Sequence, residues 1–287
     1  MKDLLLTVKF TYDDKSMHEK DENSIAIFPG HVLLNEAEPL ALHSEALGDK
    51  SGTVRVLRIN EPNSFMARLA EKQAASAARG RFITIEGIEG CGKTTLIAHL
   101  RHLFETAGCR IVVTREPGGT ALGEEVRGLF LGREDGMAVD AELLLLFAAR
   151  AEHLEKIIRP ALAAGKWVLC DRFTDATYAY QGGGRGIPEE RIALLESWIR
   201  EGLRPDLTLL LDLPVETGLT RIGRRETLDR FERKEHAFHE RVRAVYLALA
   251  AAQPKRFRVV DASRPLSEVK YTVGRILAEW FYEGGAS

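Results

Sequence analysis

The residues best suited to chemistry lie in residues 81–95, where a run of apolar, mostly β-branched residues leads into glycines and then into a helical pattern. The fixed places of the motif G-x-x-x-x-G-K-[ST] are filled by Gly87, Gly92, Lys93 and Thr94. In this motif backbone N–H groups wrap phosphate oxygens, the lysine reaches the outer phosphates and the hydroxyl holds Mg²⁺. The sequence therefore predicts a phosphate-binding loop.

A strand and a helix must flank such a loop to present it to a ligand. Residues 82–86 supply the strand, because they form a short, mainly apolar run that ends at the glycines. After the loop, apolar residues recur at helical spacing, at Leu96, Ile97, Leu100, Leu103 and Phe104. We therefore expect the N-terminus of a helix to point at the bound anion.

From residue 81 onward, short apolar runs alternate with helical patterns, which is typical of βαβ units around a parallel sheet. Further strands are expected at residues 110–114, 167–170, 207–213 and 257–260, and amphipathic helices at 141–163, 188–201, 238–251 and 266–281. This pattern predicts an α/β fold of the P-loop NTPase type, with helices on both faces of the sheet. Right-handed crossovers then place the strand ends along one edge, beside the phosphate loop.

Three polar stretches directly follow expected strands and so reach this edge, namely residues 114–120, 171–173 and 221–230. At the second of them, the Asp171 carboxylate can hold Mg²⁺ through water, while the Arg172 guanidinium can engage an anion with its fork of donors. Taken alone, this pair is better explained as a surface ion pair. A neighbouring phosphate loop favours the functional interpretation.

The composition excludes several classes of protein. The formal net charge of -2 gives no broad basic excess for binding nucleic acid or an anionic membrane. The three cysteines, Cys91, Cys109 and Cys170, show neither C-x-x-C nor zinc-site spacing, which favours a reduced, cytoplasmic setting. No apolar run approaches the roughly 20 residues of a membrane span. We therefore expect a cytoplasmic protein with no nucleic-acid or membrane partner.

From residue 81 to about residue 280 the chain resembles the bacterial thymidylate kinases, which are P-loop nucleoside monophosphate kinases. The resemblance is carried, in family order, by residues 87–95, 114–120, 171–173, 180–186, 205–208 and 228–232. The stretches Arg-Glu-Pro-Gly-Gly-Thr and Tyr-Gln-Gly-Gly-Gly-Arg-Gly are far more specific than the phosphate loop. The resemblance implies transfer of the γ-phosphoryl group of ATP to the 5′-phosphate of dTMP, with Mg²⁺, in dTTP synthesis.

The resemblance also implies which residues bind ATP and the metal. ATP would contact the loop at Gly87, Gly90, Gly92, Lys93, Thr94 and Thr95. Thr94 and, through water, Asp171 would place Mg²⁺. The catalytic charges would come from Lys93, from Arg172 and from the arginine-rich lid at residues 221–230, where Cys91 in the phosphate loop predicts that Arg221, Arg224 or Arg225 acts. Arg221 and Arg225 are the residues that we assign to catalysis, and Gly223 would give the lid hinge freedom.

The acceptor nucleotide would be held by a second set of residues. Glu89 would accept a hydrogen bond from the 3′-hydroxyl, Tyr180 would crowd the 2′ position, and Thr177 and Gln181 would lie near the base. Arg172 and Arg127 would bind the acceptor phosphate, although Arg127 is equally well explained as an exposed helix arginine. For Tyr180, a core aromatic is the alternative.

The position of the base-stacking ring departs from the family pattern. The family usually carries a phenylalanine four residues before an arginine that reads thymine, and Arg150 is that arginine here. Four residues before it lies Leu146, and Phe147 lies three before it. Either Phe147 stacks from a rotated position, which is the role that we assign to it, or leucine replaces the ring.

Two other functions and one assembly follow from these observations. The chain could be a kinase for another nucleoside monophosphate, which a pocket without the stacked ring would suit. It could also be a regulatory module that binds nucleotides without turnover, an alternative that the intact Lys93, Asp171 and Arg172 disfavour. The family further implies a homodimer, and an apolar face on residues 141–163 would suit the two-fold contact or the core equally.

Residues 1–80 lie outside the resemblance and are expected to form a separate extension before a kinase domain at residues 81–287. Strand character at residues 5–12, 24–34 and 52–59 allows a small β-rich module, whereas residues 13–23 could equally be disordered. The alanine-rich residues 64–78 indicate a helical linker. A functional product that begins near Met66 is a further possibility.

Overall fold

The structure is a computed structural model of the 287-residue chain. It describes residues 7–10, 26–28, 31–34, 52–58, 79–132, 137–223 and 230–282. The chain divides into two compact units, Met1–Glu71 and Lys72–Ser287. The division expected after residue 80 remains a prediction.

The first unit contains a small four-stranded sheet. Its strands are β1 (Thr7–Phe10), β2 (Ala26–Phe28), β3 (His31–Leu34) and β4 (Gly52–Arg58), in the order β1-β4-β3-β2. β1 pairs antiparallel with β4, β2 pairs antiparallel with β3, and β3 pairs parallel with β4. These strands fall within the three stretches that have strand character. The expected disorder at residues 13–23 and the expected helix at residues 64–78 lie outside the described residues.

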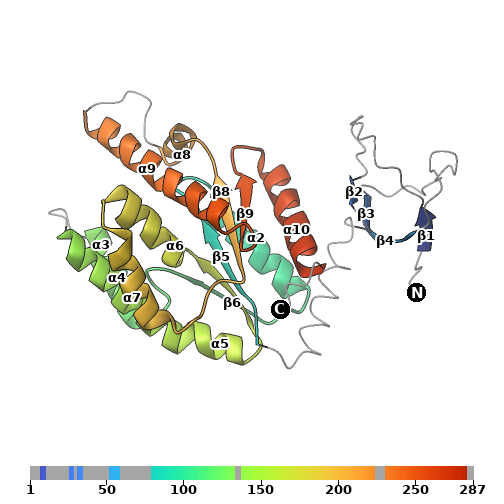
Figure 1. Ribbon diagram of the computed structural model, residues 1–287, viewed down its shortest axis with the longest axis horizontal. Coiled ribbons are helices and arrows are strands. Elements are labelled where there is room, and N and C mark those ends of the chain that lie inside the picture. Colours follow the sequence, from blue (N-terminus) through green and yellow to red (C-terminus); the bar gives the residue numbers. More distant parts are fainter. Residues whose placement is uncertain are drawn as a thin grey trace. The chain divides into compact units, whose positions relative to one another are not determined.

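The second unit is built on a five-stranded sheet in which every pairing is parallel. The strands are β5 (Phe82–Glu86), β6 (Ile111–Arg115), β7 (Trp167–Asp171), β8 (Leu207–Asp212) and β9 (Phe257–Asp261), in the order β6-β7-β5-β8-β9 (Figure 1). β5 lies at the centre, and all five of its residues are buried. A central parallel strand is covered on both faces, which explains why it forms a continuous, largely apolar run.

The helices of this unit connect successive strands. They are α2 (Lys93–Thr106), α3 (Ala121–Gly132), α4 (Val139–His153), α5 (Arg159–Ala163), α6 (Thr174–Thr177), α7 (Glu189–Arg200), α8 (Val215–Arg221), α9 (Arg230–Ala252) and α10 (Leu266–Tyr282). Two π-helical segments, η2 (Leu154–Ile158) and η3 (Tyr178–Gly184), continue α4 and α6. The long helix expected at residues 141–163 is therefore α4, η2 and α5 in succession.

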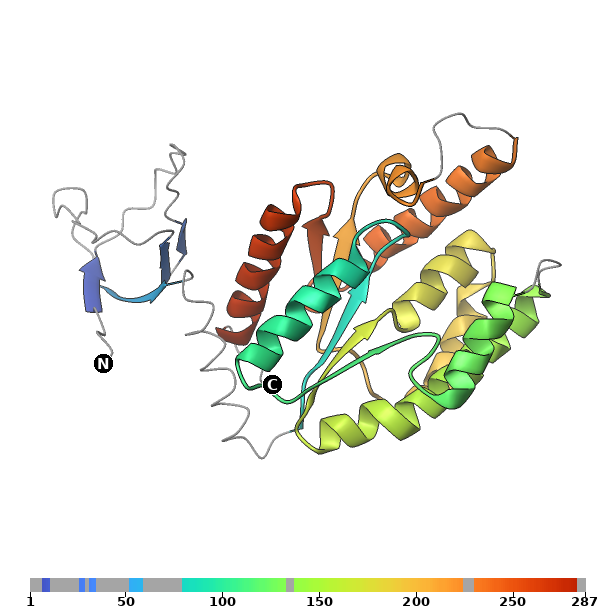
Figure 2. The ribbon, with the colours of Figure 1, turned by 180° about the vertical axis from the view of Figure 1, so that it is seen from behind.

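Helices cover both faces of the five-stranded sheet, as Figures 1 and 2 show from opposite sides. On one face Trp167 of β7 packs against Phe104 of α2 and Trp280 of α10, with ring centroids 5.1 and 6.1 Å apart. On the other face Phe82 and Val168 share an apolar cluster with residues of η2 and α5. The fold is the three-layer α/β architecture that the sequence predicts.

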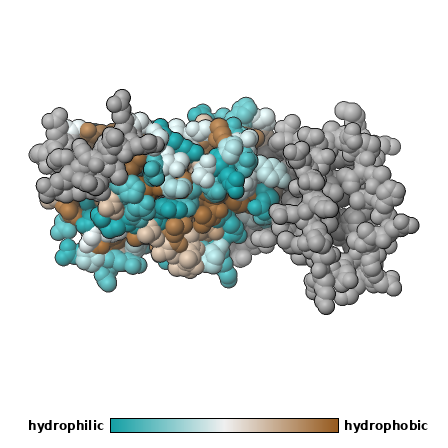
Figure 3. Space-filling model, turned by 90° about the horizontal axis from the view of Figure 1, so that it is seen from above, coloured by the Kyte–Doolittle hydropathy of each residue, from teal (hydrophilic) through white to brown (hydrophobic). Residues whose placement is uncertain are grey.

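Apolar side chains also reach the surface of this unit. Figure 3 shows one face on which hydrophobic residues lie between hydrophilic ones. Among the described residues, none of the helices has the length and apolar character needed to span a bilayer.

Candidate active site

The loop between β5 and α2 has a shape that depends on its glycines. Gly90 and Gly92 adopt positive φ angles of 73° and 94°. A Cβ atom on Gly90 would also lie 2.1 Å from the carbonyl oxygen of Gly218, so a side chain cannot fit there. Gly92 caps α2, whose first turn contains no acidic residue and leaves Thr94 and Thr95 exposed. This helix end therefore offers unpaired N–H groups and a positive dipole to an anion.

Lys93 lies beneath this loop and is 8% exposed. Its Nζ donates hydrogen bonds of 2.9 Å to the carbonyl oxygens of Gly87 and Ile88. Burial, and then the charge of Arg172, lower the pKa of Lys93. The ammonium group thus holds the loop through its carbonyl oxygens. It also experiences the positive charge of Arg172, and a bound polyanion would offset the repulsion between these two cations.

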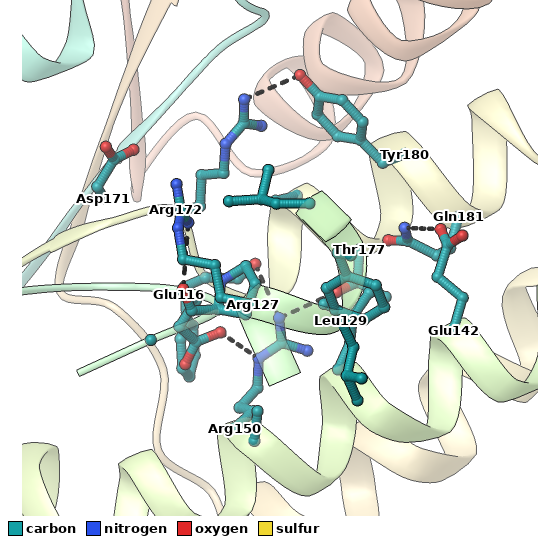
Figure 4. A pocket seen from close by; sticks show the side chains of 18 of the residues that line it. Glu116, Arg127, Leu129, Glu142, Arg150, Asp171, Arg172, Thr177, Tyr180 and Gln181 are labelled. Atoms are coloured by element: carbon teal, nitrogen blue, oxygen red, sulfur yellow. Dashed lines mark hydrogen bonds and ion pairs between the residues drawn. The ribbon is translucent and has the colours of Figure 1, made fainter. Parts of the chain in front are cut away.

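A pocket of about 600 Å³ opens beside the loop. Its lining includes nine of the residues assigned from the sequence, which are Glu89, Lys93, Arg127, Arg150, Asp171, Arg172, Thr177, Tyr180 and Gln181. Figure 4 shows that the labelled side chains among them come from different elements and meet around one cavity. Several of these residues are cationic, and apolar residues such as Leu129, Met137 and Leu146 also line the pocket, so it suits an anionic ligand that has an apolar part.

Glu89 is the acidic group of the loop, and three side chains surround it. Arg172 Nη2 lies 3.2 Å from its Oε1, the Tyr180 hydroxyl donates to its Oε2 at 2.7 Å, and His239 Nδ1 lies 3.2 Å from Oε2. Burial would raise the pKa of Glu89, but Arg172, Tyr180 and His239 outweigh burial and lower it. Glu89 is therefore a carboxylate that faces the pocket.

The turn at Arg172 depends on a second, fully buried carboxyl group, that of Glu86. The Arg172 backbone adopts a left-handed φ of 67°, which is uncommon for a residue with a side chain. Glu86 accepts hydrogen bonds from the next residue's N–H, that of Phe173, at 2.7 Å and from the Tyr246 hydroxyl at 2.7 Å. Burial, followed by the charge of Asp175, raises the pKa of Glu86 to about 8. Glu86 thus anchors the turn that presents Arg172 to the pocket.

At the other end of the pocket, Arg150 belongs to a buried polar network. Its Nε donates to Glu116 Oε2 at 2.6 Å, and its Nη2 donates to Thr177 Oγ1 at 3.0 Å (Figure 4). His153 Nδ1 lies 3.0 Å from Glu116 Oε1, while its Nε2 lies 2.7 Å from Thr114 Oγ1. Arg150 Nη1 is buried and has no hydrogen-bond partner among the described residues. This donor is available to a ligand.

The structure distinguishes between the two positions considered for the base-stacking residue. Leu146 lines the pocket, and Phe147 is not among the lining residues. Phe147 is 3% exposed and packs in an apolar cluster with Leu143, Ile187 and Ile192. The Phe147 ring instead lies under Arg150, with the guanidinium carbon 5.0 Å from the ring centroid. The assignment of Phe147 to substrate stacking does not match this placement, because the three-residue spacing turns the ring into the core.

The remaining residues assigned to the site are Arg127 and the arginines of the lid. Arg127 donates to the carbonyl oxygen of Pro117 at 3.2 Å from within the pocket lining. Arg221 lies outside that lining and donates to the carbonyl oxygen of Ala262 at 2.9 Å. Arg224, Arg225 and the rest of residues 224–229 lie outside the described residues. The catalytic role of the lid therefore stays a prediction.

Several residues of the site have no sequence motif of their own. The partners Glu86, His153, Tyr246 and His239 are single residues within strands or helices, and each contacts a residue far away in the sequence. Glu116 belongs to the polar stretch at residues 114–120, but its ion pair with Arg150 joins positions that are 34 residues apart. Only the folded structure reveals these contacts, so no local sequence pattern could have identified these residues.

The chain is similar to known proteins over most of this unit. A sequence model of the family described as thymidylate kinase matches residues 85–273. A thymidylate kinase of Bordetella petrii is 56% identical over 193 residues, which covers 67% of this chain and 92% of that protein. A thymidylate kinase of Pseudomonas entomophila is 57% identical over 199 residues, covering 69% and 95%. The crystal structure of thymidylate kinase from Ehrlichia chaffeensis aligns with a TM-score of 0.57 and 36% identity, covering 69% of this chain and 98% of that one.

Proposed function

Since the chain belongs to the thymidylate kinase family, we infer that it transfers the γ-phosphoryl group of ATP to the 5′-phosphate of dTMP, which gives dTDP. The observation that carries this function is the pocket beside the phosphate loop. It joins a loop that can bind a polyphosphate to arginines that can bind a second phosphate, within one cavity.

Phosphoryl transfer needs positioning and neutralisation of charge more than covalent chemistry by the protein. We propose that Lys93 leaves its carbonyl partners to bind the β- and γ-phosphates of ATP. Arg172, fixed by Glu86 and Tyr180, binds the acceptor phosphate from the opposite side, with Arg127 assisting. Two cations on either side of the transferred group would hold the donor and acceptor oxygens in line.

We propose that Mg²⁺ acts with ATP and is held by Thr94 and, through water, by Asp171. The residues fit this ion, because Asp171 Oδ1 is buried and has no hydrogen-bond partner among the described residues. No group of three or more metal-ligating His, Cys, Asp or Glu side chains occurs in the described part of the chain. Mg²⁺ normally keeps several waters and takes only one or two protein ligands besides phosphates. When bound, it would neutralise charge on the phosphates.

Selection of the acceptor would use the two polar ends of the pocket. We propose that Glu89 accepts a hydrogen bond from the 3′-hydroxyl of dTMP and that the Tyr180 ring restricts the 2′ position. The free Arg150 Nη1 donor would pair with a carbonyl oxygen of the thymine base, near Thr177 and Gln181. Leu146 would contact the flat face of the base in place of an aromatic ring.

The function is tested by following ADP release at fixed ATP and Mg²⁺ while dTMP, dUMP, dCMP, dGMP and UMP are supplied in turn. We expect strong stimulation by dTMP and weak stimulation by the others. Preference for another acceptor would retain the mechanism but change the substrate. ATP consumption that no acceptor stimulates would refute kinase activity and favour a regulatory nucleotide-binding protein.

We propose that the protein forms a homodimer through α4 and α7. Large apolar side chains are exposed on these two helices, with Leu144 57%, Leu194 69% and Trp198 79% exposed. Trp198→Glu should convert a dimer into a monomer in sedimentation experiments, because it places a charge in an apolar contact. Tyr271→Glu, on α10, is the control and should leave the assembly unchanged. A wild-type monomer at micromolar concentration would refute the proposal.

We also propose that the protein works in the cytoplasm. All three cysteines, Cys91, Cys109 and Cys170, are buried free thiols, which suits a reducing compartment.

A further inference from the structure

His239 is a buried histidine that no motif of the sequence marks. It lies on α9 and is 5% exposed. Its Nδ1 atom lies 3.2 Å from Glu89 Oε2, and the two groups form an ion pair when the imidazole is protonated. The charge of His239 is also one of the causes that lower the pKa of Glu89. Helix α9, which is distant from the phosphate loop in the sequence, thus contacts Glu89, the acidic residue of that loop.

The partners of Glu89 are distributed unequally between its two oxygens. Oε2 faces both the Tyr180 hydroxyl, at 2.7 Å, and His239 Nδ1, at 3.2 Å. Oε1 lies 3.2 Å from Arg172 Nη2. Each carboxylate oxygen can accept about two hydrogen bonds. Oε2 therefore accepts from Tyr180 and also faces the His239 ring, whereas Oε1 lies toward Arg172, which lines the pocket.

The position of His239 is fixed by the docking of α9 against η3. The neighbouring Phe238 ring packs edge-on against the Tyr180 ring, with centroids 6.1 Å apart. Arg241, two residues further along α9, donates to the carbonyl oxygens of Gly183 and Gly184 at 3.2 and 3.0 Å. These contacts place the histidine and the tyrosine on the same oxygen of Glu89.

We propose that His239 is a positioning residue for the acceptor nucleotide, which holds Glu89 Oε2 so that Oε1 faces the sugar hydroxyl of dTMP. This inference rests on the proposed function, in which Glu89 accepts a hydrogen bond from that hydroxyl. dTMP offers one sugar hydroxyl, so the contribution of His239 is confined to one group of the ligand. Without the histidine, the Glu89 side chain can rotate about its terminal bonds and lose the alignment.

The test compares dTMP with its 3′-deoxy analogue, which lacks the sugar hydroxyl. His239→Leu should raise KM for dTMP about 3- to 10-fold, which corresponds to one hydrogen bond, and should leave KM for ATP unchanged. With the 3′-deoxy analogue the same variant should behave like the wild-type protein. His239→Asn should restore most of the affinity for dTMP, because an amide nitrogen can occupy the place of Nδ1. His236→Leu, one turn earlier on α9, serves as the matched control, because His236 Nε2 lies 4.0 Å from Glu240 Oε1 on the same helix.

The outcomes separate the inference from the function on which it rests. If the wild-type protein does not phosphorylate dTMP, or treats dTMP and its 3′-deoxy analogue alike, the proposed function of Glu89 fails. If the wild-type protein distinguishes them but His239→Leu weakens both equally, or neither, the positioning role of His239 is refuted. A penalty confined to dTMP and relieved by His239→Asn supports it.

Discussion

Replacing Glu116 by leucine should destabilise the protein strongly, because it would leave the charge of Arg150 buried. The two side chains are 5% and 3% exposed, and their closest atoms are 2.6 Å apart. Removing one partner of a buried ion pair typically costs about 3–5 kcal/mol, since the other charge stays away from water without compensation. For a unit of this size each kcal/mol lowers Tm by about 2–4 °C. We therefore expect Glu116→Leu to lower Tm by about 6–20 °C.

The double variant Glu116→Leu with Arg150→Met separates stability from function. An apolar pair of similar volume removes the uncompensated charge, so most of the lost Tm should return. Binding of dTMP should not return, because the Arg150 Nη1 donor is absent. Glu105→Leu is the control, because Glu105 pairs with Arg101 on the exposed face of α2 and its loss should cost less than about 1 kcal/mol.

The measurements are thermal unfolding and KM for dTMP on the same preparations. A Tm decrease of less than about 2 °C for Glu116→Leu would refute the assumption that Arg150 remains charged and desolvated. A double variant that is no more stable than the single one would refute the ion pair as the source of the effect.

Three further predictions test other parts of the structure. Because the pKa of Glu86 is raised from 4.5 to about 8, its contribution to stability is complete below pH 4.5 and is lost as pH rises to about 8, so Glu86→Gln should flatten the dependence of the free energy of unfolding on pH over this range, measured by urea unfolding at several pH values. Gly184→Ala should lower the free energy of unfolding in urea by about 1–3 kcal/mol, because the added Cβ would lie 2.4 Å from the Phe238 ring. Gly274→Ala on α10 is the control, because its Cβ would meet no atom within 4 Å, so the change should be neutral or stabilising. Deleting residues 1–71 should leave kcat for dTMP within twofold, and loss of activity in a folded truncated protein would show that the first unit contributes to turnover.

The sequence predicts those parts of the fold that local patterns determine. Residues 82–86 were expected as a strand and form β5, because an apolar run that ends in glycines has few other solutions. The amphipathic pattern predicts a helix that starts at residue 238, but α9 begins at Arg230, because its first turns are charged and carry no apolar periodicity. Short motifs likewise predict the glycine-rich loop after β5 and the turn after β7.

The partners of the site residues were not predictable in the same way. The spacing to Arg150 predicts Phe147 in the pocket, but the difference of one residue directs its ring into the core and leaves Leu146 at the cavity. The contacts of Glu116 with His153 and of Glu89 with His239 join residues that are distant in the sequence. Such pairs depend on how helices dock on the sheet, which local patterns do not encode.

The hydrogen bonds from Lys93 to the carbonyl oxygens of Gly87 and Ile88 have a consequence for the choice of phosphate donor. The ammonium group is already coordinated by its own loop, so a nucleotide gains from it only the difference between phosphate and carbonyl ligation. We expect a ligand with a single phosphate to compete less well for the lysine than a triphosphate, which carries more negative charge. The carbonyl oxygens of Gly87 and Ile88 thus compete with phosphate for Lys93. We expect this competition to weaken the binding of adenine nucleotides that carry few phosphates.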